Sequence, residues 1–157
     1  MQRQQAAETW RKRSAARFYA VQALFQMEAA DHPVGSVLDE FETWRIGAAD
    51  DDGNQMEVAD IDLFRRLVGE AVTCQSRIDQ LTDRALVAAW PIDRIDPTLR
   101  ALFRAAGAEL VASATPPAVV INEFVEVAKA FFPEGREARF VNAVLDHMAR
   151  EARPEAF

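Results

Sequence analysis

Two arginines, Arg136 and Arg139, lie in the first turn of the last predicted helix, which spans about residues 136–152. The free amide groups at a helix N-terminus favour anions, and guanidinium groups bind phosphate oxygens. Lys129, on the preceding predicted helix, would add a third cation if the two helices are neighbours. These residues could bind phosphate, but the same pattern is also typical of an ordinary solvated helix face.

A second pair of arginines, Arg13 and Arg17, lies four residues apart on the first predicted helix. On a helical wheel Arg17 falls on the apolar stripe that contains Val21 and Leu24. A cation is unexpected on a stripe that should be buried, so its presence requires an explanation. In one interpretation the first turns project beyond the bundle, so that both arginines face a polyanion. In the other, Arg17 snorkels or forms a structural ion pair. The periodicity does not choose between them.

Patterns of catalytic or metal chemistry are weak in this chain. The six glycines do not fit the spacings of nucleotide-binding loops or of a serine-hydrolase elbow. Glu123 and Glu126 are one turn apart, but the helical wheel places both on the solvent side, so we predict no enzyme. The single cysteine, Cys74, and two histidines do not make a metal cluster, and we predict neither metal nor cofactor. We interpret Cys74 as a small buried hydrophobe.

Charge is distributed unevenly along the 157 residues, of which half are hydrophobic. The net charge is −7, yet residues 1–20 sum to +4 and residues 21–62 to −10. Phosphate binding depends on local cations, so a nucleic-acid partner remains possible at a confined site. The lack of a possible internal disulfide, of a signal peptide and of a long apolar run predicts one globular cytoplasmic protein with no membrane association.

Alanine-rich segments with apolar residues at helical spacing predict an all-α protein of about seven helices. The predicted helices begin near Ser14, Val34, Asp60, Ser76, Asp96, Thr115 and Arg136. Asp60 and Asp96 are predicted N-caps, and Ser76 to Asp79 resembles a capping box. Residues 46–58 are predicted to form an exposed loop, and His32-Pro33 and Trp90-Pro91 to end helices.

The two arginine pairs lie on the first and last predicted helices, whose apolar spacing predicts which side chains are buried. The first is expected to bury Val21, Leu24 and Phe25, with Phe18 at the edge of the stripe. The last is expected to bury an arc that begins with Phe140 and to leave Arg139 outward. Phe140 lies at the margin of that arc, so its ring could serve both the core and the surface.

Three segments, SAARFYAVQALFQ, TPPAVVINEFVEVAKAF and RFVNAVLDHMA, together resemble the NusB family of transcription antitermination factors. The resemblance spans nearly the whole chain. Ala108 stands where the family commonly has an aromatic residue, and the segment FFPEGREA is a residue or so longer than usual. The first departure concerns packing, and the second weakens any transfer of contacts within that loop.

This resemblance implies two small packed helical bundles that form a single globular unit. We expect residues 1–13 to be a flexible basic N-terminal arm and residues 14–157 to be the RNA-binding domain. The implied function is non-enzymatic: the protein pairs with the ribosomal protein NusE and binds boxA-like single-stranded RNA. The complex then joins elongating RNA polymerase with other Nus factors and supports transcription of ribosomal RNA.

The implied RNA surface combines cations with aromatic rings, which bind phosphates and splayed bases respectively. Its members are Arg13, Arg17, Lys129, Phe131, Arg139 and Phe140, and Arg136 joins them from the helix-start argument. Two alternatives remain open. The chain could be an RNA-binding module related to ribosomal RNA methyltransferases, although no catalytic domain follows, or a helical scaffold whose acidic segment binds a basic protein. RNA binding should weaken with salt, whereas scaffold binding should not.

Overall fold

The computed structural model describes residues 2–49, 53, 57–86 and 94–157, and its α-helices match the predicted number and order. They are α1 (Gln2–Ala30), α2 (Val34–Glu40), α3 (Ile61–Thr73), α4 (Gln75–Ala85), α5 (Pro97–Ala112), α6 (Pro117–Phe131) and α7 (Arg136–Ala152). A π-helix, η1 (Phe41–Arg45), follows α2, and a short 3-10 helix, η3 (Pro154–Ala156), follows α7. None of the described helices is both long and apolar enough to span a membrane.

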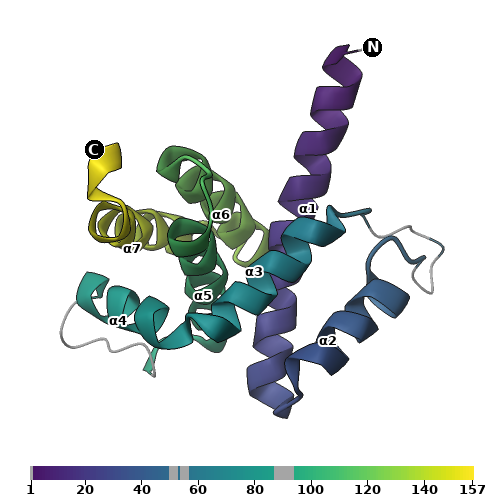
Figure 1. Cartoon of the computed structure of the whole chain (residues 1–157), viewed down its shortest axis with the longest axis horizontal. Helices are drawn as coiled ribbons and strands as arrows, with labels where there is room; N and C mark the ends of the chain where they lie inside the picture. Colours follow the sequence, from purple (N-terminus) through teal and green to yellow (C-terminus); the bar gives the residue numbers. More distant parts are fainter. Residues whose placement is uncertain (1, 50–52, 54–56, 87–93) are drawn as a thin grey trace.

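Helix α1 is longer than predicted, because it begins at Gln2 and not near Ser14. Residues 2–13 contain good helix formers and no glycine or proline, so nothing in them stops the helix. The apolar pattern marks only the part of α1 that packs against other helices. Residues 2–11 are all exposed and project from the body of the molecule (Figure 1), and we call them the N-terminal arm. The segment expected to be a flexible arm is helical in this structure.

The predicted caps explain where α3 and α5 begin. The Asp60 carboxylate accepts a hydrogen bond from the Leu63 amide at 3.0 Å, and Asp96 accepts one from the Thr98 amide at 2.7 Å. The capping box at Ser76 was wrong, since α4 begins at Gln75 without a side-chain cap. Asp79, the acidic residue of that predicted box, instead forms an ion pair with Arg104 on α5. The predicted helix end at Trp90-Pro91 lies outside the described residues.

The second predicted helix, over about residues 34–44, consists of two pieces. Helix α2 ends at Glu40, and the backbone continues as the wider π-helical turn η1. Phe41 is fully buried at this junction, with its ring centroid 5.7 Å from that of Phe64. Trp44, three residues later, is 73% exposed. The apolar pattern did not show this change of helix type.

Helix α5 lies at the centre of the fold and contacts α1, α3, α4, α6 and α7 (Figure 1). In Figure 1, α1 and α2 lie on one side of it and α4 and α7 on the other, with α6 above it in this view. The buried side chains form one continuous hydrophobic core, so the two helical groups make a single unit. Near the C-terminus, Arg153 donates a hydrogen bond to the Leu110 carbonyl at 2.8 Å and ties the chain end to α5.

Candidate nucleic-acid interface

The start of α7 presents two exposed arginines. Gly135, with φ of 81°, turns the chain into this helix, and no side chain caps the first-turn amides. Arg136 and Arg139 are exposed, and within the described part of the chain neither forms an ion pair. Their charges and the free amides are therefore available to an anion. The position of both arginines in the first turn agrees with the sequence, and their binding of phosphate stays a prediction.

Phe140 follows these arginines and is 37% exposed, so it lies at the margin of the buried arc as expected. Its ring meets the buried ring of Phe103 edge to face, with centroids 6.1 Å apart. This contact fixes one side of the ring while another part stays in contact with solvent. A partly exposed, positioned ring of this kind can stack on an unpaired base.

Helix α6 brings Lys129 and Phe131 to the same end of the molecule, because residues 132–135 alone separate α6 from α7. Lys129 is exposed and pairs with Glu126 at 3.1 Å, a surface contact that a phosphate can replace. Phe131 is half-buried and stacked on Phe18, with ring centroids 4.8 Å apart and planes 11° apart. One face of the Phe131 ring is therefore already covered.

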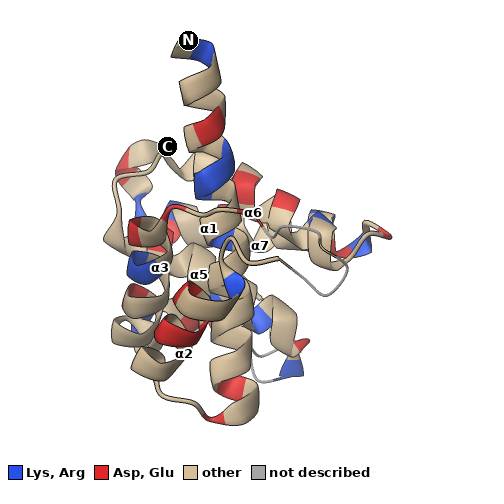
Figure 2. Ribbon diagram, turned by 90° about the vertical axis from the view of Figure 1, so that its right-hand side faces the viewer, with Lys and Arg blue, Asp and Glu red and all other residues tan. Residues whose placement is uncertain are grey.

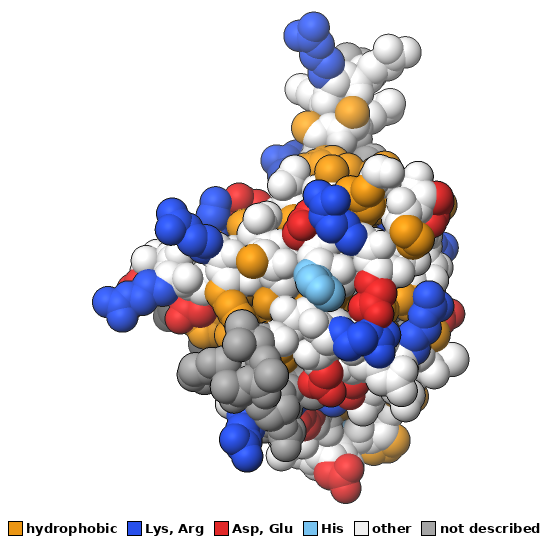
Figure 3. All heavy atoms as spheres, turned by 90° about the vertical axis from the view of Figure 1, so that its left-hand side faces the viewer, with side chains coloured by type: hydrophobic (Ala, Val, Ile, Leu, Met, Phe, Trp, Pro, Cys, Tyr) orange, Lys and Arg blue, Asp and Glu red, His pale blue; other side chains and the backbone are white. Residues whose placement is uncertain are grey.

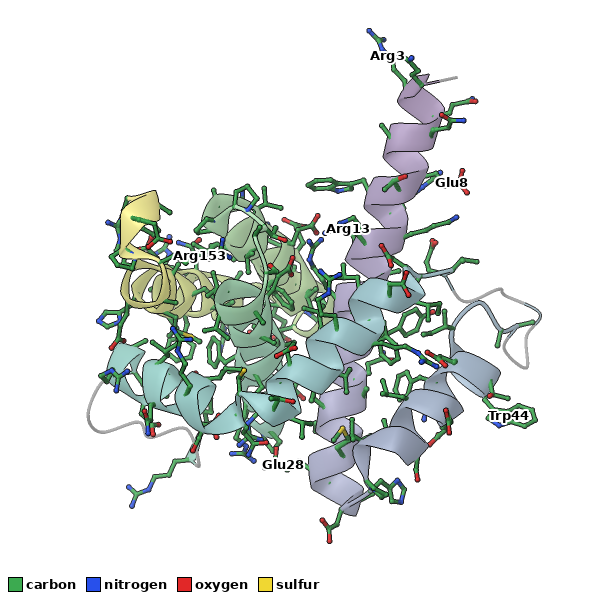
Figure 4. All side chains as sticks on the ribbon, viewed as in Figure 1. Arg3, Glu8, Arg13, Glu28, Trp44 and Arg153 are labelled. Atoms are coloured by element: carbon green, nitrogen blue, oxygen red, sulfur yellow. The ribbon has the colours of Figure 1, made fainter. Side chains whose placement is uncertain are left out.

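Arg13 lies on α1 at the base of the arm, where the helix enters the body, whereas Arg3 lies near the arm's tip (Figure 4). The Arg13 side chain is 38% exposed, and its guanidinium is 3.9 Å from the Asp60 carboxylate. In Figure 2, Lys and Arg residues occur along the arm and at its base, and acidic residues gather around α2. The basic arm and the acidic region around α2 agree with the positive charge of residues 1–20 and the negative charge of residues 21–62.

Arg17 is buried, and this corrects its prediction as a residue that contacts RNA. The side chain is 1% exposed and donates two hydrogen bonds, each of 2.8 Å, to the Glu109 carboxylate. Burial opposes its charge, but the hydrogen bond and the charges of Glu109 and Glu123 raise the pKa of Arg17. Of the two interpretations left open by the sequence, the structure supports the structural ion pair.

The prediction that Glu123 faces solvent was wrong. Glu123 is 5% exposed, lies 3.5 Å from Arg17 and accepts a hydrogen bond from the Ser14 hydroxyl at 3.0 Å. Helix α6 is covered by α1 and α5 as well as by α7, so its buried arc is wider than one apolar stripe. The ion pairs and the Ser14 hydrogen bond hold α1 against α5 and α6. The only signal in the sequence was the unexplained cation on the apolar stripe of α1.

Phe25 also departs from its predicted position, because it is 39% exposed and not buried. It borders a hollow of about 370 Å³ that α1 shares with η1, the start of α5 and the end of α6. The lining residues are Val21, Gln22, Phe25, Gln26, Ala29, Ala30, Arg45, Thr98 and Phe131. This hollow therefore meets the predicted RNA surface at Phe131. No pattern in the sequence indicated this hollow.

The body carries cations and carboxylates side by side on the face drawn in Figure 3, without one continuous basic field. Among the described residues, no group of three or more His, Cys, Asp or Glu side chains could hold a metal ion. The arrangement offers separate cations with aromatic rings beside them. Such a surface suits a single strand of nucleic acid more than the regular backbone of a duplex.

Comparison with known proteins gives one consistent family. Residues 14–150 match the model of the NusB family. The chain is 44% identical over 153 residues to the transcription antitermination protein NusB of Granulibacter bethesdensis, covering 94% of this chain and 93% of that protein. A solved structure of T. maritima NusB aligns with a TM-score of 0.72 and 30% identity, covering 92% of this chain and 95% of the other. A structure of the antitermination factors NusB and NusE with double-stranded RNA shares the fold, with a TM-score of 0.70, 24% identity and coverage of 88% and 96%.

Proposed function

Because the chain belongs to the NusB family, we propose that it is a transcription antitermination factor. In this role it binds boxA-like single-stranded RNA together with NusE and joins the elongating RNA polymerase, supporting ribosomal RNA transcription. The name of its Granulibacter relative supports the proposal, and so does the fold that the chain shares with NusB in a complex of NusB and NusE with double-stranded RNA. The role requires binding surfaces and no catalytic site.

The observation that carries the RNA-binding part is the start of α7. Two exposed arginines without ion pairs in the described structure stand at uncapped helix amides, next to the partly exposed Phe140 ring. Phosphates bind to the cations, and an unpaired base stacks on the ring. We add Lys129 and Arg13, whose present ion pairs are at the surface and exchangeable.

Two residues of the predicted surface act differently in this proposal. Arg17 is a positioning residue, because its ion pair with Glu109 holds α1, and thus Arg13, in a fixed place relative to α5. Phe131 presents only the ring surface that its stacking on Phe18 leaves uncovered. Neither needs to be the main anchor of the RNA.

For NusE we propose the hollow bordered by Phe25. The hollow combines apolar and amide side chains of α1 with an exposed aromatic ring at its edge, a mixed lining that suits a protein partner. It adjoins Phe131, so a protein seated there would touch the edge of the RNA surface and could strengthen RNA binding. Phe25→Asp should remove the effect of NusE while leaving the RNA affinity of the protein alone unchanged.

The test of the function is fluorescence anisotropy of labelled boxA RNA and of a scrambled RNA, with and without NusE, at two salt concentrations. We expect a preference for boxA, tighter binding with NusE and steep weakening with salt. Arg136→Ala with Arg139→Ala should weaken binding at least tenfold if each contact contributes about 1 kcal/mol. Arg66→Ala, an exposed arginine on α3, is the matched control and should change nothing. Salt-insensitive binding, or none, would favour a protein scaffold instead.

A further inference from the structure

Trp10 lies on the N-terminal arm and is 55% exposed, a large apolar surface to leave in water. It borders a shallow hollow of about 500 Å³ on the arm, together with Gln4, Ala7, Glu8 and Arg11. Ala7, three residues earlier, is too small to cover the indole ring. The ring is thus available to a flat ligand.

The position of Trp10 on the helix gives it a direction. It precedes Ser14 by four residues and Arg17 by seven, so all three lie on one face of α1. Ser14 and Arg17 bind carboxylates of α6 and α5 on that face. Trp10 continues this face into the N-terminal arm, whose residues are all exposed. A molecule bound there would lie beside the body and not at the far side of the arm.

The charges around Trp10 favour an anionic ligand. Glu8, the acidic residue of the arm, pairs with Lys12 at 3.3 Å. Arg3 and Arg11 are exposed and form no ion pair within the described residues. Two available guanidinium groups therefore flank an open indole ring. Cations next to an exposed aromatic ring are the elements that bind single-stranded nucleic acid, with phosphates on the cations and a base on the ring.

We propose that Trp10 is a base-stacking residue for single-stranded RNA, with Arg3 and Arg11 binding the phosphates next to the stacked base. This inference rests on the proposed RNA-binding function and adds the arm to the interface. It assigns to the RNA a path from the start of α7 to the arm. The stack should persist at high salt, where the contacts of the arginines with phosphate weaken, because stacking does not release counterions.

The first measurement compares Trp10→Ala, Trp10→Phe and Trp44→Ala for binding of boxA RNA by anisotropy. Trp44 is the matched control, because it is also exposed, at 73%, but lies on η1 in the acidic part of the chain. We expect Trp10→Ala to weaken binding roughly tenfold, the fold-change typical of one lost stack. Trp10→Phe should keep most of the affinity, and Trp44→Ala should keep all of it.

The second measurement identifies the base. A series of boxA RNAs, each with one abasic position at a different place along the strand, is tested for binding to the wild type and to Trp10→Ala. One abasic position should weaken binding to the wild type and have no further effect on Trp10→Ala. In a Trp44→Phe, Trp90→Phe background, RNA should also quench the fluorescence of the remaining Trp10.

Three results would overturn the proposal. Equal affinities of wild type and Trp10→Ala, with Arg136→Ala and Arg139→Ala still weakening binding, would leave the RNA-binding function intact and remove Trp10 from it. Quenching of Trp10 by NusE without RNA would assign the ring to a protein contact. Absence of boxA binding by the wild type with NusE present would remove the proposed function and this inference together.

Discussion

The buried ion pair between Arg17 and Glu109 joins α1 to α5. The wheel placed Arg17 on an apolar stripe and thus indicated that it needed a partner, but Glu109 and Glu123 lie far along the chain. Local spacing cannot identify such partners, and Glu123 was even assigned to the opposite face. The start of α7 was predictable, because Arg136, Arg139 and the helix amides that they flank are close in sequence.

Replacing Arg17 tests the buried ion pair. Arg17→Met keeps the length of the side chain but leaves Glu109 and Glu123 buried without their cation. Breaking one partner of a buried pair typically costs about 3–5 kcal/mol, so we expect a loss of that size in the free energy of unfolding. Urea denaturation followed by circular dichroism measures it, with the exposed Arg11→Met as control. A loss below about 1 kcal/mol would mean that Arg17 is not a structural anchor.

Cys74 should be a slow thiol. Its side chain is only half-buried, so the prediction of a buried hydrophobe was too strong, but burial and the contact with Glu70 raise its pKa. A raised pKa lowers the thiolate fraction at neutral pH, and the thiolate is the reactive form. We expect reaction with Ellman's reagent to be slower in the folded protein than after unfolding in urea. Its rate should still be rising with pH at pH 9, and a plateau below pH 8 would contradict the raised pKa.

At the scale of helices, the sequence predicted the elements whose ends carry local signals. Asp60 and Asp96 cap as expected, and α1 ends before His32-Pro33 at Ala30. The sequence patterns did not show features that depend on packing, nor the segment that packs against nothing. The arm has no apolar stripe to reveal it, and the switch to η1 begins at the buried Phe41. The presence and order of the helices were therefore more predictable than their lengths.

The contact of α4 with α5 depends on a glycine. A methyl group added at Gly107 would overlap the Cγ2 atom of Ile78, which is fully buried. Gly107→Ala should therefore destabilise the fold by about 1–3 kcal/mol, although alanine favours helix. Gly69→Ala on α3, where nothing lies within 4 Å, should stabilise it by up to about 1 kcal/mol.

A double variant assigns the cause of this effect. Ile78→Ala removes the group that the new methyl would meet, so Gly107→Ala should cost less in that background than in the wild type. Thermal or urea unfolding of the four proteins measures the coupling. Strictly additive losses would show that the methyl group is accommodated elsewhere and that the close approach of α4 to α5 does not require glycine.

For the whole molecule, the proposed function requires a protein of net charge −7 to offer a surface to a polyanion. It does so by concentrating available cations at the start of α7 and on the arm, while many other basic residues pair with carboxylates in the body. The uneven charge of the sequence predicted a confined site. Whether the two groups of cations serve one ligand depends on the arrangement of α1, α6 and α7, which composition and spacing cannot specify.

Deletion of residues 1–11 separates folding from binding at this scale. Residues 2–11 are exposed, so the deletion should leave the thermal midpoint unchanged. It removes Arg3 and Arg11, and each lost phosphate contact should lower the salt dependence of single-strand binding by about 0.7 in the slope of log K against log salt. We therefore expect boxA binding that is weaker and less salt-dependent, by about 1.4 in this slope. Arg66→Ala with Arg77→Ala removes two exposed charges from α3 and α4 and should leave the slope as it is. If the deletion and this control had the same slope as the wild type, the RNA would be bound by the body alone, and the arm would need another role.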